Sequence, residues 1–301
     1  FSPKVVVVGN DIRLSGPALS KALIQGLLDS NVDVVNIGEC GTEEIYFAVP
    51  FLQADGGICI TASHNPANYN GMKFVGKGSA PISADNGLLD IKRLAEIARF
   101  ATSAKKGKHS QLDIRKSYID KLMTFVDLDK LKPLTLVANP GNGGAGAVIN
   151  AIEEFLPFSF KKLNFTPDGN FPNGVPNPLL PENRQDTREA VIAYSADFGI
   201  AWDGDFDRCF FFDEKGQFIE GYYIVSLIAK MMLEKQPNEK IVYDPRLYWA
   251  TLDTVKKANG QLIVSKTGHA YIKQTMRNEN ALYGGEMSAH HYFRDFYYCD
   301  N

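Results

Sequence analysis

The segment Leu134–Phe165 reads LTLVANPGNGGAGAVINAIEEFLPFSFKKLNF and decides the fold class. Its pattern predicts four consecutive elements: a strand over Leu134–Asn139, a glycine loop over Gly141–Gly146, a helix over Ala147–Leu156 and a strand over Ser159–Phe165. Two parallel strands need a crossover connection of this kind, which is usually a helix. The segment therefore predicts an α/β fold.

The same unit occurs once before this segment and once after it. The earlier unit has strands at Lys4–Gly9 and Val32–Ile37, with a helix that begins at Gly16-Pro17. The later unit has a strand, a helix and a strand at Lys240–Tyr243, Leu247–Ala258 and Gln261–Val264. Three α/β units are thus expected. The polar stretch Thr102–Gln111 is a candidate linker, and Asp213–Gln217 is a candidate turn between units.

The composition is that of a folded globular protein. Of the 301 residues, 45% are hydrophobic and 22% are charged, which excludes disorder, collagen and coiled coil as the main class. Lysine and arginine number 32 against 35 acidic residues, a net charge of −3, so no strong positive field would attract nucleic acid or an anionic membrane. The longest apolar runs fall far short of the ~20 residues that cross a bilayer. We therefore expect neither a nucleic-acid nor a membrane partner.

The four cysteines indicate a reducing compartment. Cys40, Cys59, Cys209 and Cys299 lie far apart, and none belongs to a C-x-x-C motif. Such spacing fits a reduced protein better than a disulfide framework. A cytoplasmic location is the resulting prediction.

A serine-containing loop, TASHNP, spans Thr61–Pro66 and follows the strand-like Gly57–Thr61. A serine at the carboxyl end of a parallel strand lies where open α/β sheets bind their ligands. Ser63 is therefore a candidate nucleophile. The alternative is a simple turn, because serine and asparagine form turns readily.

An acidic loop, DGDFDR, spans Asp203–Arg208 between two strand-like runs, Phe198–Trp202 and Cys209–Phe212. Carboxylates at alternate positions can converge on one Mg²⁺, which prefers oxygen ligands. The adjacent Arg208 would suit a phosphate group, which a guanidinium can grip with two hydrogen bonds. A solvated acidic turn is the alternative.

The glycines Gly141, Gly143 and Gly146 match the G-x-G-x-x-G pattern of dinucleotide-binding loops, with Asp168 as a candidate for the ribose-binding acid. This pattern supports a rival class, an NAD-dependent oxidoreductase. Against it, Pro140 precedes the first glycine. A purely structural tight turn is the other interpretation.

Two further loops carry groups that can bind sugars or phosphates. In GGEMSAHH, residues 284–291, the side chains of Glu286 and Ser288 can hydrogen-bond sugar hydroxyls. In KTGH, residues 266–269, Lys266 and His269 could hold a phosphate or a sugar. An ordinary polar loop and a helix N-terminus are the respective alternatives.

Four of these loops, taken in their order along the chain, resemble those of the α-D-phosphohexomutase family, which contains phosphomannomutases and phosphoglucomutases. They are TASHNP, DGDFDR, KTGH and the loop GGEMSAHH. The resemblance runs from about Lys4 to Asp300. It implies three similar α/β domains of mixed sheets with crossover helices, with boundaries at 1–112, 113–216 and 217–301. A fourth, C-terminal domain of a different fold is expected after about Asn301. The chain is therefore expected to be a fragment.

The resemblance also implies roles for individual residues. Ser63 would carry the phosphate, and Ser63, Asp203, Asp205 and Asp207 would hold Mg²⁺. Lys73 would be the general acid or base, with His64 and His269 as second candidates, and Arg208 would hold phosphate. The implied substrate contacts are Glu286, Ser288, Lys266, His269, Arg246 and Arg13.

The implied reaction interconverts hexose 6-phosphate and hexose 1-phosphate through a hexose 1,6-bisphosphate, which is also the activator. The run AHHYF after Ser288 favours mannose over glucose as the sugar and nucleotide-sugar synthesis as the purpose. Besides the oxidoreductase, a catalytically silent sugar-phosphate binder remains as an alternative. The sequence leaves the oligomeric state open.

Overall fold

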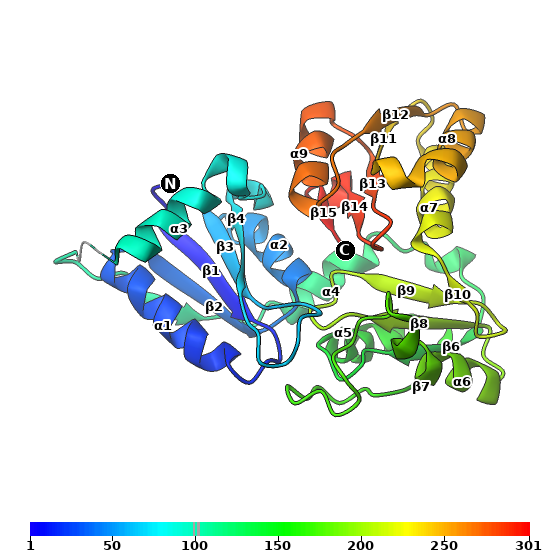
Figure 1. Cartoon of the computed structure of the whole chain (residues 1–301), viewed down its shortest axis with the longest axis horizontal. Coiled ribbons are helices and arrows are strands. Elements are labelled where there is room, and N and C mark those ends of the chain that lie inside the picture. Colours follow the sequence, from blue (N-terminus) through cyan, green and yellow to red (C-terminus); the bar gives the residue numbers. More distant parts are fainter. Residues whose placement is uncertain (99, 101–102) are drawn as a thin grey trace.

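Three five-stranded sheets follow one another along the chain, each with helices packed on it (Figure 1). The structure is a computed structural model that describes residues 1–98, 100 and 103–301. Within these residues, no helix has the length and apolar character needed to cross a membrane.

The first sheet has the strand order β4-β3-β1-β2-β5. Its strands are β1 (Val5–Asn10), β2 (Asp33–Glu39), β3 (Gly56–Ile60), β4 (Met72–Gly76) and β5 (His109–Gln111). Strand β1 lies parallel to both β2 and β3, whereas β4 is antiparallel to β3, so the sheet is mixed. The β-branched run Val5–Val8 suits a central strand of this kind, because both faces of a parallel sheet are covered.

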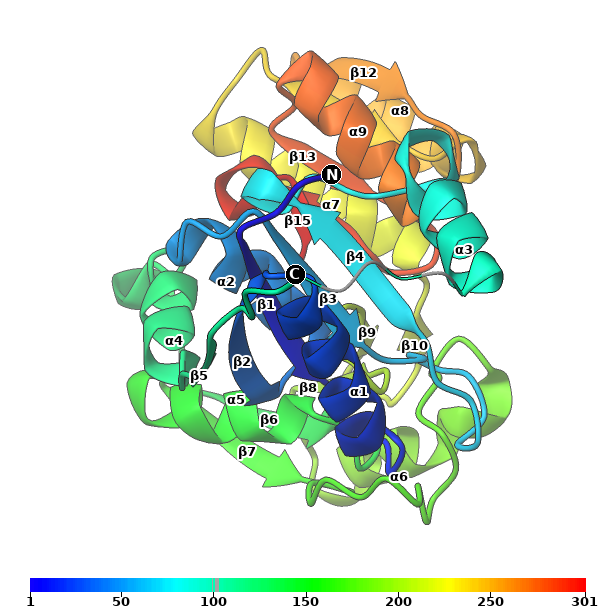
Figure 2. The same ribbon diagram turned by 90° about the vertical axis from the view of Figure 1, so that its left-hand side faces the viewer.

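Helices cover both faces of this sheet. Helix α1 (Gly16–Asp29) packs Ile24 onto one face and lies in front of the sheet in Figure 2. Helix α2 (Thr42–Phe51) packs Ile45 and Val49 onto the other face. Helices α3 and α4 span Leu88–Ile97 and Arg115–Met123.

The second sheet repeats this arrangement with the order β10-β9-β8-β6-β7. Its strands are β6 (Leu134–Asn139), β7 (Phe158–Lys162), β8 (Phe198–Trp202), β9 (Cys209–Phe212) and β10 (Phe218–Ile219), and its helices are α5 (Ala145–Ile152) and α6 (Gln185–Ala193). Strands β7, β6 and β8 are parallel, and β9 and β10 continue the sheet as an antiparallel hairpin.

The third sheet has the order β12-β11-β13-β14-β15. Its strands are β11 (Lys240–Tyr243), β12 (Gln261–Val264), β13 (Tyr283–Gly285), β14 (His291–Phe293) and β15 (Cys299–Asp300), and its helices are α7 (Gly221–Lys235), α8 (Tyr248–Lys257) and α9 (His269–Glu279). Helices α7 and α8 share one apolar cluster with the sheet, and α9 belongs to another. The predicted class of three mixed-sheet α/β domains is confirmed.

Some predicted elements need correction. The helix predicted over Ala147–Leu156 begins at Ala145, and its last turn becomes a 3₁₀ helix at Glu153–Phe155. Within the candidate linker, Thr102 lies outside the described residues, but His109–Gln111 forms β5 and hydrogen-bonds to β2. Its polar residues escaped prediction because an exposed edge strand needs no apolar side chains.

The predicted domain boundary between residues 216 and 217 falls within the β9–β10 turn. Phe218 and Ile219 pair with β9, and Asp213 N donates to Gln217 O at 2.9 Å across the turn. These contacts favour a boundary after Ile219. The boundaries themselves stay predictions.

One buried apolar cluster contains residues of all three domains. Phe206, 5% exposed, lies at the contact between the first and second domains. A Cβ placed on Gly41 would lie 2.2 Å from the Phe206 ring, and one on Gly144 would lie 2.8 Å from it. The ring therefore fills space that only glycines leave open. Phe296, on the third domain, belongs to the same cluster.

Replacing Phe206 with alanine tests this contact. The cavity should lower the free energy of unfolding by about 3–5 kcal/mol, the usual loss for a buried aromatic ring. Chemical denaturation would measure it, with Phe155→Ala as the control because that ring is 48% exposed. An equal, small loss in both variants would show that Phe206 does not join the domains.

Candidate active site

The three sheets bring their loops together at equivalent places. Each sheet contains one strand, β1, β6 or β11, that has a parallel neighbour on both sides. Such an arrangement creates a switch point at the carboxyl ends of the strands, where α/β proteins bind ligands. The loop with Ser63 follows β3, the acidic loop follows β8, and the loop with Glu286 follows β13. Contacts from Ser63 to Asp203 and from His290 to Asp207 link the three loops.

Ser63 faces the acidic loop directly. Its Oγ donates a hydrogen bond to Asp203 Oδ2 at 2.6 Å and lies 3.2 Å from His64 Nδ1. Arg208 closes the group, because its Nη2 lies 2.7 Å from Asp203 Oδ2 and 2.6 Å from His64 Nδ1. A hydroxyl, a carboxylate, an imidazole and a guanidinium thus meet at one point. The sequence interpretation of TASHNP as a simple turn does not explain this convergence.

The carboxylates of Asp203, Asp205 and Asp207 form a buried cluster. One oxygen from each lies within 4.8 Å of the others, and the three residues are at most 3% exposed. The Oδ1 atom of each has no hydrogen-bond partner among the described residues. Buried anionic oxygens without partners are costly unless a cation accompanies them. This donor set fits Mg²⁺, a hard cation that takes carboxylate oxygens.

Lys73, on β4, lies against the same carboxylates. Its Nζ donates to Asp205 Oδ2 at 2.7 Å and to Asp207 Oδ2 at 2.5 Å. Burial alone would lower the pKa of Lys73, but the two carboxylates outweigh this effect and raise its pKa well above the usual value. This environment therefore favours the protonated, ammonium form of the side chain.

The pKa values of the carboxylates differ with their surroundings. Burial raises the pKa of Asp203 to about 6, although the charge of Arg208 opposes the shift. For Asp207, burial acts in the same direction, but the charge of Lys73 and the nearby imidazole of His290 prevail and hold its pKa well below the usual range. Neighbouring cations therefore keep part of the cluster ionised.

The third-domain loop presents Glu286 in a fixed position. Its Oε1 accepts a hydrogen bond from Gly268 N at 2.8 Å, and its Oε2 accepts one from the Tyr292 hydroxyl. Ser288 Oγ lies 2.9 Å from His290 Nδ1. His290 Nε2 in turn lies 3.6 Å from Asp207 Oδ1, so this loop touches the acidic cluster.

The remaining predicted substrate contacts differ in placement. His269 lies beside His290, with ring centroids 6.4 Å apart, and burial lowers its pKa to about 3. Arg246 pairs with Asp244, whose Oδ2 also accepts from the backbone of the Glu286 loop at Met287 N. Lys266 is exposed and lies 5.6 Å from the ring of Tyr271. Its substrate role stays a prediction.

The predicted phosphate contact for Arg13 is corrected by the structure. Arg13 is 1% exposed, and its two terminal nitrogens donate to four backbone carbonyl oxygens. Its Nε faces Asp11 Oδ2 at 3.3 Å. The four N–H groups of the two terminal nitrogens are thus used within the protein, and the buried Nε faces Asp11, so the guanidinium presents no fork of donors to a phosphate.

The dinucleotide interpretation of Gly141–Gly146 is wrong. The loop follows β6 as predicted, but it packs against the acidic loop, and Gly144 N donates to Gly204 O at 3.3 Å. Asp168 accepts from the backbone and side chain of Asn170. The backbone N–H groups of residues 141–144 thus bond within the protein and do not point at a pyrophosphate site. The carboxylate of Asp168 is likewise used by Asn170 and not by a ribose.

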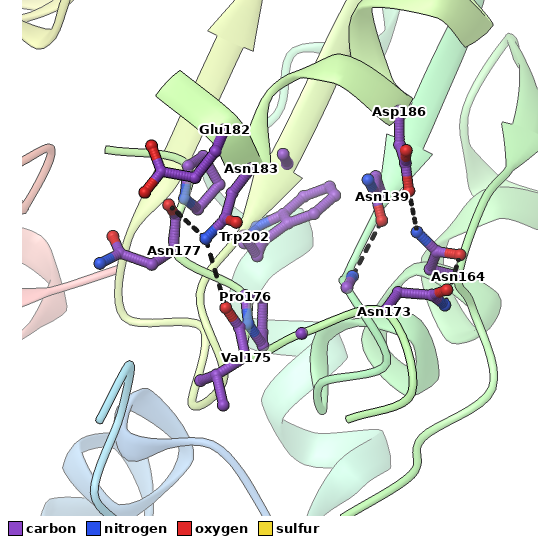
Figure 3. A pocket seen from close by; sticks show the side chains of 14 residues that line it. Asn139, Asn164, Asn173, Val175, Pro176, Asn177, Glu182, Asn183, Asp186 and Trp202 are labelled. Atoms are coloured by element: carbon purple, nitrogen blue, oxygen red, sulfur yellow. Dashed lines mark hydrogen bonds between the residues drawn. The ribbon is translucent and has the colours of Figure 1, made fainter. Parts of the chain in front are cut away.

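A small pocket of about 90 Å³ lies beside this loop, around Trp202. Figure 3 shows amide side chains that bond within its wall; they belong to Asn139, Asn164, Asn173 and Asn183. The bonds of Asn173 and Asn183 hold parts of the loop over residues 169–181 in place. The polar side chains that line the pocket therefore hold the second domain together.

Sequence analysis missed Thr42, the first residue of α2. Its Oγ1 donates to Asp205 Oδ2 at 2.5 Å, and its backbone N donates to Asp205 O at 3.2 Å. The two residues are 163 positions apart, and a threonine in TEEIYF gives no sign of a long-range partner. The contact between His290 and Asp207 was missed as well, because it too joins residues far apart in the sequence.

Three α/β domains whose serine loop, carboxylate cluster and Glu286 loop meet at one junction define an isomerase of the phosphohexomutase class. Comparison with known proteins agrees. The three α/β/α domain profiles of phosphoglucomutase/phosphomannomutase match in order: domain I at residues 2–99, domain II at 116–216 and domain III at 220–301. The chain belongs to the phosphoglucomutase/phosphomannomutase family.

Individual relatives are similar along nearly the whole chain. A phosphomannomutase of Salmonella montevideo is 59% identical over 100% of this chain and 68% of its own length. A phosphomannomutase of Vibrio cholerae is 55% identical over 99% of this chain and 65% of its own length. The crystal structure of a phosphoglucomutase/phosphomannomutase family protein from Burkholderia thailandensis matches with a TM-score of 0.92 and 35% identity, over 99% of this chain and 65% of that one.

Replacing Asp205 with asparagine tests the metal site. Loss of one anionic ligand should weaken Mg²⁺ binding at least about tenfold, because the site depends on carboxylate charge. Isothermal titration calorimetry would measure the affinity. Asp168→Asn is the matched control, since that carboxylate is only half-buried and lies outside the cluster. Equal affinity in both variants would place the metal elsewhere.

Proposed function

We propose that this protein is a phosphomannomutase that interconverts mannose 6-phosphate and mannose 1-phosphate through a phosphate on Ser63 and a hexose 1,6-bisphosphate intermediate. The observation that carries the proposal is the 2.6 Å hydrogen bond from Ser63 Oγ to Asp203 Oδ2, inside a carboxylate cluster that fits Mg²⁺. The named phosphomannomutases at 55–59% identity support mannose as the sugar. Phosphoglucomutase or dual activity is the second candidate.

The phosphoryl group needs neutralisation and alignment more than covalent assistance. Asp203, Asp205, Asp207 and a phosphate oxygen on Ser63 would hold Mg²⁺, which withdraws charge from the group in transit. Arg208 contacts His64 directly and bonds to Asp203 Oδ2, the same oxygen that accepts from Ser63 Oγ. It is therefore placed to bind the phosphate oxygens. The serine phosphate would thus lie between a guanidinium and the carboxylate cluster.

The transfer step exchanges one O–P bond for another. A sugar hydroxyl oxygen forms a bond to phosphorus while the bond from phosphorus to Ser63 Oγ breaks. The hydroxyl proton leaves to a base, and Oγ ends as a hydroxyl after receiving a proton. Lys73 carries a proton close to Asp205 and Asp207 and is our candidate for the acid that protonates Oγ; it could act as the base only after it has given up that proton. His64 and His269 are second candidates, and burial lowers the pKa of both, which favours the neutral imidazole.

The sugar must bind in two orientations, because each phosphate faces Ser63 in turn. Glu286 and Ser288 would bind two ring hydroxyls in either orientation, and the bonds from Gly268 and Tyr292 hold the Glu286 carboxylate in place. Arg246 and Lys266 would contact the phosphate distant from Ser63. The bisphosphate, as intermediate and activator, completes this proposal.

The cellular context follows from the same proposal. Mannose 1-phosphate is the form from which nucleotide sugars are made, so supply of this precursor is the proposed purpose. All four cysteines are free thiols, which supports a cytoplasmic location.

Replacing Ser63 with alanine tests the phosphoryl carrier. The complete reading frame with Ser63→Ala should lose mutase activity by about 10³-fold or more, because no other group can carry the phosphate. Intact mass should also lack the gain of roughly 80 Da that phosphorylation adds. Ser30→Ala, at an exposed helix end, should leave both unchanged. Wild-type turnover in Ser63→Ala with bisphosphate supplied would refute the phosphoserine.

Replacing Glu286 with glutamine tests the sugar loop. The change should weaken hexose phosphate binding about 10- to 100-fold, as expected for a lost hydrogen bond to a charged group. The phosphate on Ser63 should persist. Glu279→Gln, whose partner is Lys240 at the end of α9, is the control. If the serine phosphate disappeared while sugar affinity stayed intact, the assigned role would be wrong.

A further inference from the structure

The backbone of Ser63 has an unusual conformation. Its φ is +49°, in the left-handed region that non-glycine residues seldom occupy. Such strain persists only where surrounding contacts determine the conformation, and it concentrates at functional positions. The contacts that hold this residue are therefore of interest.

A closed circuit of hydrogen bonds surrounds Ser63. Its backbone N donates to Thr61 Oγ1 at 2.9 Å, and Thr61 Oγ1 donates to Asp11 Oδ2 at 2.7 Å. Asp11 Oδ1 accepts from Arg13 N at 3.0 Å. Arg13 Nη2 then donates to Ser63 O at 2.7 Å. Both backbone groups of the strained residue are thus held by one connected set of side chains.

Arg13 extends the circuit along the rest of the loop. Its Nη2 also donates to Asn65 O at 2.6 Å, and its Nη1 donates to Pro66 O at 2.8 Å and Tyr69 O at 2.9 Å. Only the planar, five-donor fork of arginine can serve so many acceptors at once; a lysine ammonium cannot. Burial of this charge is compensated by the four carbonyl oxygens and by Asp11.

The second domain covers this arrangement. The ring of Phe171 lies 5.3 Å from the Arg13 guanidinium carbon, and a Cβ on Gly169 would lie 2.4 Å from Ile12 O. The domain that supplies Asp203 therefore also excludes water from the residues that hold Ser63.

We infer that Asp11, Arg13 and Thr61 are positioning residues that fix the Ser63 backbone so that Oγ, and the phosphate on it, points at the carboxylate cluster. The inference rests on the proposed function of Ser63. Phosphoryl transfer requires the attacking and leaving oxygens to be roughly in line, and a displacement of about 1 Å can cost 10²-fold in rate. These three residues touch neither substrate nor the reacting atoms; they act through Ser63.

Thr61→Val removes the central hydroxyl while keeping a similar volume, and Thr61→Ser retains the hydroxyl. Asn70→Ala is the matched control, because Asn70 bonds to Ser15 and Gly71 in the same loop but not to Ser63. In the complete reading frame, rapid-quench mass spectrometry measures single-turnover phosphorylation of Ser63 by mannose 1,6-bisphosphate. Calorimetry measures the Mg²⁺ affinity of each variant.

We expect Thr61→Val to slow phosphorylation 10- to 100-fold, with Mg²⁺ affinity unchanged. Thr61→Ser and Asn70→Ala should stay within about threefold of wild type. Arg13→Lys, which keeps the charge but loses the fork, should slow the step at least as much as Thr61→Val.

The outcomes separate this inference from the proposed function. A wild-type protein that never gains phosphate on Ser63 would refute the proposed function, whatever the variants do. A phosphorylated wild type with Thr61→Val and Arg13→Lys equally fast would refute the positioning role. Slower phosphorylation with an equal loss of Mg²⁺ affinity, or failure of both variants to fold, would show general scaffolding and overturn it as well.

Discussion

Burial of three carboxylates at one point is the constraint on which the rest of the structure depends. Asp203, Asp205 and Asp207 expose almost nothing to solvent, and each keeps one oxygen without a hydrogen bond among the described residues. Such a cluster is stable only if cations compensate it. Lys73 and Arg208 supply part of that charge, and the remaining free oxygens suit a divalent metal. A phosphoryl-transfer site needs the same concentration of opposite charges.

Residues of all three domains form the site. Thr42 of the first domain bonds to Asp205, and Phe206 fills the space between Gly41 and Gly144. His290 of the third domain reaches Asp207. Each of the three carboxylates therefore contacts a residue outside the second domain, because Asp203 also accepts a hydrogen bond from Ser63. The packing between the domains therefore also sets the geometry of the site, because a shift at the Phe206 contact would move the acidic loop.

Sequence patterns predicted what is local. The bounds of β6, β8, β9, β11 and β12 are confirmed, because each is a short apolar run between turn residues. The four candidate loops could be singled out because their polar residue types are concentrated within a few positions. Long-range partners left no such trace: Thr42 has an ordinary helix-start sequence, and the polar edge strand β5 resembles a linker. Arg13 was misassigned because a sequence shows an arginine after a strand but not the carbonyls that occupy its donors.

The central claim is that the acidic cluster and Ser63 together form one metal-dependent phosphoryl site. Crystals of the protein grown with Mn²⁺ in place of Mg²⁺ test it most directly, through the anomalous signal of the metal. The account predicts a single strong peak bounded by Asp203, Asp205 and Asp207, within bonding distance of an oxygen on Ser63. A peak elsewhere, or a cluster compensated by Lys73 and Arg208 alone at saturating Mn²⁺, would contradict it.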